Sequence, residues 1–150
     1  MQALLIEAHK LPKLIDTDKS LANYRKLLDC DLIDMPQFGD NYNDNRVSFI
    51  VDDEGKLNHK EFNRGIVCNS DDYYGVKKGE LLDVICGSFL IVGYNPKTGS
   101  DCSLTESQIA KFEKIFHDPQ ILIKMNDQFT VIADPNFIES EQNQEEQRSR

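Results

Sequence analysis

The segment 79–119, GELLDVICGSFLIVGYNPKTGSDCSLTESQIAKFEKIFHDP, constrains the fold of this chain more than any other part of the sequence. Its apolar run at 88–94 is short and lies between Gly87 and Gly93, which is typical of a buried strand. A Pro-containing turn at 95–99 follows, and a helix begins after that turn. We therefore expect this strand and this helix to share one hydrophobic core.

The helix after this turn has the clearest start signal in the chain. Thr105 and Gln108 have the spacing of a capping box, in which two side chains satisfy free N–H groups of the first helical turn. Leu104 and Ile109 flank the cap as a hydrophobic staple does. Pro119 cannot continue a helix, so the helix is expected to end before it.

The remaining elements are predicted from hydrophobic periodicity and from turn residues. A buried strand is expected at 3–7, and 13–16 returns as its antiparallel hairpin partner. A helix capped by Thr17 or Asp16 follows, with an apolar face that starts at Leu21. The other expected elements are short strands at 30–35 and 46–51, a loop at 56–79 with an extended piece at 65–68, a helical turn or a strand at 81–86, and a strand pair at 121–125 and 128–133.

The order of these elements favours an α+β fold, because strands and helices do not alternate in regular βαβ units. We expect a mostly antiparallel sheet with two amphipathic helices packed on it, in a single domain over 1–138. From Glu139 onward no apolar residue occurs, so 139–150 is expected to be a disordered acidic tail. The residues expected in the core are Leu4, Ile6, Leu21, Leu28, Phe49, Ile91, Ile109, Phe112 and Phe116.

The charge of the chain limits its partners. It has 26 acidic and 17 basic residues, and its formal net charge is −9. This charge repels nucleic acid and anionic lipid, so neither direct nucleic-acid binding nor a membrane partner is expected. It suits a partner protein with a basic surface. No signal-like segment opens the sequence, and no apolar run reaches the roughly 18 residues of a membrane span, so a cytoplasmic location is expected.

The cysteines show no metal-binding spacing. Cys30, Cys68, Cys86 and Cys102 are irregularly spaced and contain no CxxC pair, so a zinc site is not expected. Free thiols agree with a reducing compartment.

The acidic turn at 52–55 has a superficial likeness to a calcium-binding loop. When Gly55 takes the sixth position of such a loop, Ile50 falls at the first position and has no oxygen ligand to offer. A β-turn rich in Asp and Gly is the better interpretation. We therefore expect no metal and no other cofactor.

No catalytic constellation is visible in the sequence. The glycines at 87, 93 and 99 have neither the Walker spacing nor a G-x-G-x-x-G pattern, and no nucleophile elbow is present. An acid, a base and a nucleophile cannot be assembled from the pattern, so a non-enzymatic role is expected.

Asn63 and Arg64 form the polar pair most open to a binding role. Arg64 precedes the apolar piece GIVC, which would hold its guanidinium near the core. It is expected either to pair with a carboxylate such as Asp83 or to present its planar fork to a small anionic ligand. With Ser88, which precedes the apolar strand, these residues are the candidate ligand contacts.

The acidic turns provide a second candidate site, for a protein partner. Asp52, Asp53 and Glu54 follow one expected strand, and Asp71 and Asp72 lie in the polar loop after the next. Acidic turns are commonly only solvated, but if these two groups cluster they form a negative face that a basic protein would recognise.

Several motifs together resemble a small uncharacterised family. They are the opening ALLIE, VDDEGKL followed by FNRGI, DVICGSFLIVG and SLTESQIAKFEKIF, and the likeness spans about residues 1–132. The chain departs from that pattern at Cys86 and Ser88, where Ala and Thr are usual, and in its longer acidic tail. The family carries a domain-of-unknown-function label and occurs in phages, plasmids and conjugative elements, mostly of Gram-positive bacteria. The resemblance implies an origin in a mobile element and no known catalytic residue.

Three functions are compatible with these observations. The first is an accessory protein of a phage or mobile element, which binds and inhibits a host-defence protein through its acidic surface. The second is a module that captures a small anionic signal such as a nucleotide, with Arg64 as a contact. The third is a regulatory or structural interaction protein.

Overall fold

The computed structural model describes residues 1–39, 42–70, 72–139 and 142. The described elements are β1 (Gln2–Ile6), β2 (Lys13–Asp16), α1 (Leu21–Leu28), β3 (Ile33–Asp34), β4 (Val47–Asp52), β5 (Phe62–Val67), β6 (Asp72–Tyr73), β7 (Val76–Lys77), β8 (Leu81–Cys86), β9 (Phe89–Asn95), β10 (Ser100–Cys102), α2 (Glu106–Ile115), β11 (Gln120–Met125) and β12 (Gln128–Ala133). All strand pairs among the described residues are antiparallel, so the expected antiparallel sheet with two helices is confirmed. No helix among the described residues combines the length and the apolar character that a membrane crossing needs.

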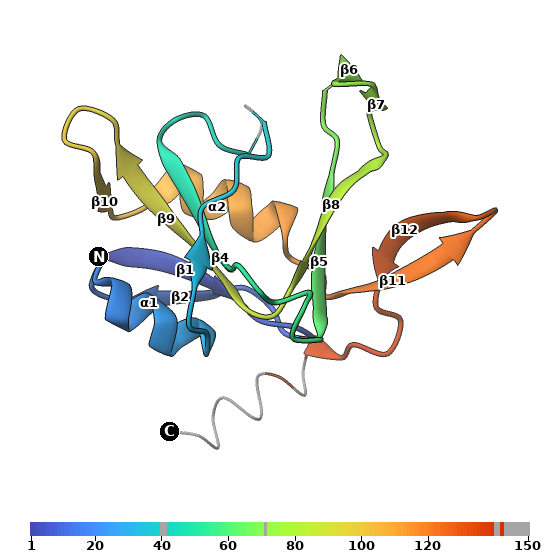
Figure 1. The fold of residues 1–150 in the computed structure, drawn as a ribbon, viewed down its shortest axis with the longest axis horizontal. Coiled ribbons are helices and arrows are strands. Elements are labelled where there is room, and N and C mark those ends of the chain that lie inside the picture. Colours follow the sequence, from blue (N-terminus) through green and yellow to red (C-terminus); the bar gives the residue numbers. More distant parts are fainter. Residues whose placement is uncertain (40–41, 71, 140–141, 143–150) are drawn as a thin grey trace.

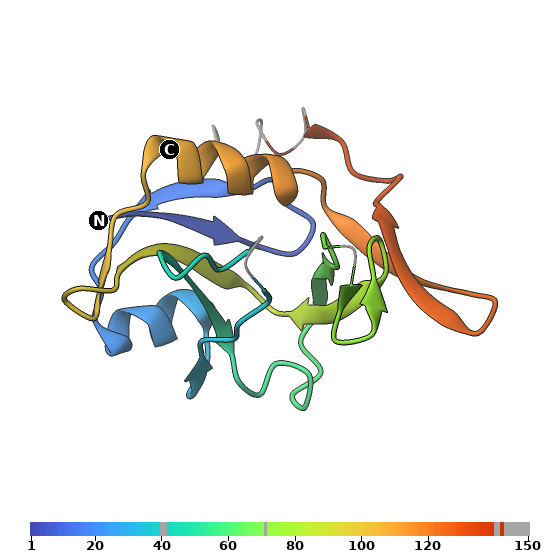
Figure 2. The same cartoon turned by 90° about the horizontal axis from the view of Figure 1, so that it is seen from above.

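The main sheet is built around β9, the strand that the apolar run at 88–94 predicts. Its strand order is β2-β1-β9-β4-β3, and β10 pairs with the far half of β9. The two helices cover opposite faces of this sheet, as Figure 2 shows with α2 above the strands and α1 below them. The sheet is therefore the middle of three layers.

The alternation of side chains along the strands divides the apolar residues between the two faces. Phe89 and Ile91 of β9 face α2, whereas Leu90 and Val92 face α1. The α2 side holds most of the large aromatic side chains, and Phe49 lies at their centre with four ring neighbours at centroid distances of 5.3 to 6.3 Å besides Tyr42. The buried aromatic residues of this cluster are Phe38, Tyr42, Phe49, Phe89, Phe112 and Phe116.

Most residues that the sequence places in the core are buried. Leu4, Ile6, Leu28, Phe49, Ile91, Phe112 and Phe116 are buried, and Ile109 is partly buried against the same cluster. The prediction for Leu21 is wrong, because its side chain is 45% exposed. The helix starts one residue after Ser20, whose Oγ accepts from Asn23 N, so neither Thr17 nor Asp16 is its cap. Leu21 is thus the first helical residue and lies at the edge of the covered face.

A second body of strands lies beside the sheet, where Figure 1 shows β5 and β8 running side by side. These strands form an antiparallel ribbon, and the β6–β7 hairpin extends from one end of it. The extended piece expected at 65–68 is confirmed in part, because β5 covers 65–67, but the loop expected at 56–79 is wrong at 62–64 and at the β6–β7 hairpin. The segment 81–86 is a strand rather than a helical turn. The first half of β5 was read as a loop because its buried positions include two polar residues, Asn63 and Arg64.

The β11–β12 hairpin confirms the strand pair expected after the second helix. It packs against the ribbon, and Gln120 Oε1 accepts a hydrogen bond of 2.9 Å from Gly65 N. Of the expected tail, only Glu139 and Gln142 belong to the described residues, and Gln142 Oε1 accepts from Leu11 N. The rest of the tail lies outside them.

Candidate functional site

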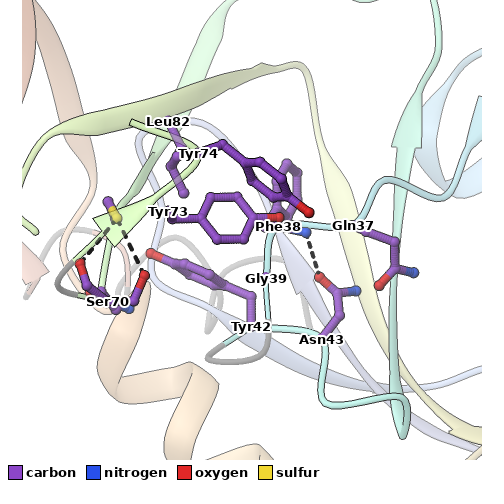
Figure 3. A pocket seen from close by; sticks show the side chains of 11 residues that line it. Gln37, Phe38, Gly39, Tyr42, Asn43, Ser70, Tyr73, Tyr74 and Leu82 are labelled. Carbon is purple, nitrogen blue, oxygen red and sulfur yellow. Dashed lines mark hydrogen bonds between the residues drawn. The ribbon is translucent and has the colours of Figure 1, made fainter. Parts of the chain in front are cut away.

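Two cavities meet at the side chain of Phe38, which lines both of them. One has a volume of about 640 Å³ and is lined by tyrosines, amides and small polar residues (Figure 3). The other has a volume of about 410 Å³ and is rimmed by carboxylates. We call them the aromatic cavity and the acid-rimmed cavity. Both volumes fall in the range of roughly 300–1,000 Å³ that small-ligand sites occupy.

Three segments of the chain form the acid-rimmed cavity. They are the stretch from Asp34 to Phe38, the end of β4 with the turn that follows it, and the second half of β8. The turn approaches β8 closely at Gly55, where a β-carbon would lie 2.5 Å from the carbonyl oxygen of Cys86. A residue with a side chain would therefore push the turn away from β8 and open this cavity.

The rim of this cavity carries an excess of negative charge. Asp34, Asp53 and Asp83 have exposed side chains on it, and Lys56 is the only cation that faces them among the described lining residues. Lys56 Nζ lies 2.7 Å from Asp83 Oδ1. This pair is exposed on both sides, so solvent weakens it to roughly 0–1 kcal/mol.

Asp52 belongs to the same cavity but has a structural role. Its Oδ1 accepts from Glu54 N at 2.9 Å, which closes the turn and confirms the β-turn interpretation. Its Oδ2 lies 2.7 Å from Lys60 Nζ, and that ammonium also donates to the carbonyl oxygens of Leu28 and Asp29. Lys60 thus connects the buried carboxylate to the C-terminal end of α1, where a positive charge is favourable.

Comparison of the sequence with known protein families gives one match. The family described as "Domain of unknown function (DUF3846)" matches residues 1–117. The chain belongs to the DUF3846 family. No curated protein and no solved structure matches it. The match includes every residue of both cavities and ends before β11, whereas the likeness read from the sequence extended to about residue 132.

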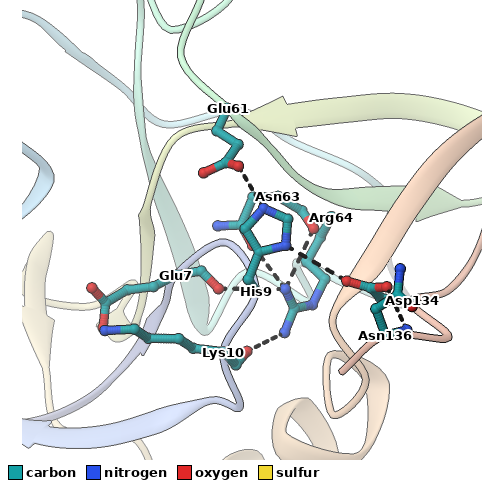
Figure 4. Close-up of polar contacts among 8 residues, drawn as sticks. All are labelled: Glu7, His9, Lys10, Glu61, Asn63, Arg64, Asp134 and Asn136. Carbon is teal, nitrogen blue, oxygen red and sulfur yellow. Dashed lines mark hydrogen bonds and ion pairs between the residues drawn. The ribbon is translucent and has the colours of Figure 1, made fainter. Parts of the chain in front are cut away.

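The polar pair Asn63–Arg64 lies inside this DUF3846 fold rather than on its surface. Arg64 is 0% exposed, and its guanidinium donates to the carbonyl oxygen of Phe116. It also donates to the carbonyl oxygens of Lys10 and Glu7, as Figure 4 shows. The distances from Arg64 Nη2 to Lys10 O and to Phe116 O are 2.7 and 3.1 Å. Burial lowers the pKa of Arg64, and Asp118 opposes this change. An anionic ligand would have to displace these carbonyls to reach the guanidinium.

The ion pair expected between Arg64 and Asp83 is not formed. Asp83 stays at the surface, where it keeps its hydration and pairs with Lys56 instead. Asn63 is also fully buried: its Nδ2 donates to Ile6 O and Gly87 O, and its Oδ1 accepts from Arg64. Ser88 lies half-buried between β8 and β9. The structure therefore does not bring these four residues into one ligand site.

His9 covers this polar junction from outside, as Figure 4 shows. Its Nε2 lies 2.5 Å from Glu61 Oε1, and its Nδ1 lies 3.7 Å from Asp134 Oδ2. The contact joins the β1–β2 turn to the start of β5 and to the segment after β12. No spacing in the sequence could have indicated it, because the three residues are far apart along the chain.

The acidic residues chosen for a protein partner do not form one continuous face. The turn at 52–54 precedes β5 and the β6–β7 hairpin follows it, so the two lie at opposite ends of this strand (Figure 1). Asp53 is exposed, Glu54 is half-buried and Asp52 is buried. Asp71 lies outside the described residues, and for Asp72 only the backbone position in β6 is described.

The cysteines of this DUF3846 chain are unpaired, and Cys68 is the buried one. Burial raises the pKa of the Cys30 and Cys86 thiols. Within the described ranges, no three His, Cys, Asp or Glu side chains converge in a way that would hold a metal ion.

Proposed function

We propose that this protein is a binding module that takes a basic side chain of a partner protein into the acid-rimmed cavity. The observation that carries this proposal is the arrangement of Asp34, Asp53 and Asp83 around one cavity with an apolar floor. Two of these carboxylates, Asp53 and Asp83, also stand out in the sequence.

The lining suits a lysine or arginine side chain in both of its parts. Phe38 and Ile85 are buried and Val51 is half-buried, so together they offer an apolar floor to an aliphatic stem. The carboxylates around the rim then accept hydrogen bonds from the cationic head, and charge-assisted bonds of this kind are the stronger ones. Leu57 is 77% exposed at this cavity and adds apolar surface for the neighbouring residue of the partner.

The charge of the whole chain favours the same partner. Its net charge of −9 attracts a basic surface over a distance and accelerates association. The exposed Lys56–Asp83 pair costs little to open, so an incoming cation can replace Lys56 at Asp83.

The biological setting of the proposal rests on the family resemblance of the sequence motifs, which implies an origin in a phage or another mobile element. In that setting the module acts in the host cytoplasm as a non-enzymatic accessory protein and inhibits a basic host-defence protein. Binding rather than catalysis is supported by the polar interior, since Asn63, Arg64 and Lys60 are all engaged in holding the fold.

The proposal is tested with a short peptide that carries one arginine between leucines, and with its citrulline analogue, which has the same shape without the charge. Titration calorimetry should show binding of the arginine peptide and at least about tenfold weaker binding of the citrulline peptide. Asp53→Asn and Asp83→Asn should each weaken binding about 1.4- to fivefold, as expected for partly exposed charge pairs of roughly 0.2–1 kcal/mol. Higher salt should weaken it further, because charges are screened beyond about 8 Å at physiological ionic strength.

The matched control is Asp127→Asn, which removes the same charge at the exposed tip of the β11–β12 hairpin. It should leave the affinity within about twofold, since only long-range attraction changes. Equal binding of both peptides, or an equal loss in the control, would overturn the cavity as the binding site. In cells, a phage whose growth a host defence restricts should recover with the wild-type protein and not with the Asp53→Asn/Asp83→Asn double variant.

A further inference from the structure

The aromatic cavity is a second site with different chemistry from the acid-rimmed one. Its walls come from residues 37–39 and 42–43, residues 68–70 after β5, and the β6–β7 hairpin. Figure 3 shows Tyr42, Tyr73 and Tyr74 gathered around it, with Gln37 and Ser70 on opposite sides. Among the described lining residues, only Phe38 is shared with the acid-rimmed cavity, and the proposed binding of a basic side chain involves none of the others.

One wall of the cavity is fixed by internal hydrogen bonds. The hydroxyl of Tyr42 donates to Val67 O at 2.7 Å and accepts from Val67 N at 3.2 Å, which holds its buried ring against the end of β5. Asn43 Oδ1 accepts from Phe38 N at 3.0 Å and fixes the loop. Burial raises the pKa of Tyr42, so its hydroxyl stays neutral at ordinary pH. This wall is preorganised for a flat ligand.

The opposite wall is formed by the β6–β7 hairpin. The tyrosines of this hairpin and Gln37 across from them carry polar groups that are not used in internal hydrogen bonds within the described part of the chain. The ring of Tyr73 packs over Gly39 and meets Tyr74 edge-to-face at a centroid distance of 4.7 Å. Tyr74 is 91% exposed and follows Tyr73 at the hairpin turn. Among the described residues, the amide of Gln37 and the hydroxyls of these two tyrosines have no hydrogen-bonding partner. Aromatic faces and unused polar groups therefore point at the same space.

The charge of the lining narrows the ligand further. No Asp, Glu, Lys, Arg or His is present among the described residues of this cavity, in contrast to the acid-rimmed one. An ionised phosphate or carboxylate would find no cation here and would be repelled by the chain's net charge of −9. A ligand that enters must therefore be neutral where it touches the protein.

We propose that the aromatic cavity binds a nucleobase, presented as a free base or a nucleoside. A base is a flat, neutral ring, and every type of base can stack on tyrosine or phenylalanine. Its edge carries adjacent donors and acceptors, which match the amide of Gln37 on the cavity wall. The tyrosine hydroxyls add two further groups that can donate or accept.

The absence of a cation in this lining predicts an unusual order of affinities. The base and ribose enter, while a phosphate on the ribose remains in solvent and experiences only repulsion. Nucleosides are therefore expected to bind more tightly than the matching monophosphates at low salt, and the gap should narrow as salt screens the repulsion. A phosphate-binding site would give the opposite order.

The experiment is a titration of the full chain with adenosine, guanosine, cytidine and uridine and with their monophosphates, followed by calorimetry and by NMR. Glucose and a proline-rich peptide are included, because aromatic sites also bind sugars and proline helices. At least one nucleoside should bind saturably and more tightly than its monophosphate. Tyr73→Ala should weaken it at least about fivefold, since stacking on one aromatic residue contributes roughly 1–3 kcal/mol. Gln37→Ala should reduce the preference for one base over another.

Phe129→Ala is the matched control, because it removes an exposed aromatic ring from the other hairpin. It should leave nucleoside affinity unchanged. If Tyr73→Ala perturbs the hairpin, Tyr73→Phe is used instead, because it keeps the ring and removes only the hydroxyl. Its affinity for the nucleoside then shows how much of the binding depends on that hydroxyl. Absence of nucleoside binding, tighter binding of the monophosphate, or binding of only the sugar or the peptide would each overturn the proposal. Binding of the arginine peptide is measured on the same samples, so failure of one cavity is distinguished from failure of the other.

Discussion

The sheet core and the polar junction around Arg64 are held together by different forces. Below α2, Phe49 and its neighbours exclude water by contact between apolar surfaces, and no directional bond is needed. At the junction, one buried guanidinium joins the β1–β2 turn, β5 and the end of α2 through carbonyl oxygens. The sheet core can tolerate small changes of shape, whereas the junction depends on a single side chain with a fixed geometry.

The largest effect is expected at the junction. Arg64→Met keeps the length and volume of the stem but removes every donor, so several buried acceptors are left without a partner. Each such loss costs roughly 1–3 kcal/mol, and we expect the free energy of unfolding to fall by more than about 4 kcal/mol in urea denaturation. Lys97→Met removes a charge from an exposed turn and should change it by less than about 0.5 kcal/mol. A tolerated Arg64→Met would show that apolar packing, not the carbonyl contacts, holds the junction.

The sheet core provides the next largest effect. Phe112→Ala removes a fully buried ring that lies 5.6 Å from the ring of Phe49, and it should cost about 3–5 kcal/mol. Glu113→Ala, on the exposed side of the same helix, is the control and should have little effect on the denaturation midpoint. If Phe112→Ala were as mild as this control, the assignment of the α2 face would fail.

The next prediction concerns the contact between the β5–β8 ribbon and the β11–β12 hairpin, which pack closely against each other. A β-carbon at Gly65 would lie 2.7 Å from Val131 Cγ1 and 2.8 Å from Leu81 Cδ1. Gly65→Ala should therefore cost about 1–3 kcal/mol by overpacking and increase hydrogen exchange in the hairpin. Adding Val131→Ala makes room and should recover part of the loss. Without such recovery, the strain would have to arise elsewhere.

The difference between the sheet core and the polar junction also explains which parts of the fold could be predicted from the sequence. Periodicity and local caps identified β1, β2, β9, α2 and the last hairpin, because those signals lie within a few neighbouring residues. They indicated only the second half of β5, since its start, with Asn63 and Arg64 in buried positions, reads as a polar loop. The partners that satisfy these residues in the interior are backbone carbonyls of distant segments. Every residue has a backbone carbonyl, so the sequence does not indicate which of them will accept these hydrogen bonds.

The candidate sites follow this pattern. Asp53 and Asp83 were selected from the sequence for different roles, yet they line the same cavity. Asp34 and Phe38 were not selected, because only the folded chain brings their segment beside β4 and β8. The aromatic cavity depends on Tyr42, which lies in a loop, and on Tyr73 of the two-residue strand β6, and neither segment has a periodic signal.

The smallest effect is expected at the start of α2. This helix allows a direct comparison, because its start is held by a local cap and its end by the polar junction around Arg64. At the start, Thr105 Oγ1 accepts from Gln108 N at 3.2 Å and Gln108 Oε1 accepts from Thr105 N at 2.9 Å, as the capping box in the sequence predicts. At the end, the carbonyl of Phe116 accepts hydrogen bonds from Arg64, which lies on β5.

Thr105→Ala should cost about 1 kcal/mol, because the lost bond is local and water can replace it at an exposed helix end. Thr105→Ser keeps the hydroxyl and should be nearly neutral in the same urea titration. The cost of Thr105→Ala should also add to that of Arg64→Met, since the two ends share no partner and distant sites act independently. Strong non-additivity would mean that α2 responds as one rigid unit, and the sheet core and the junction would then be a single cooperative structure.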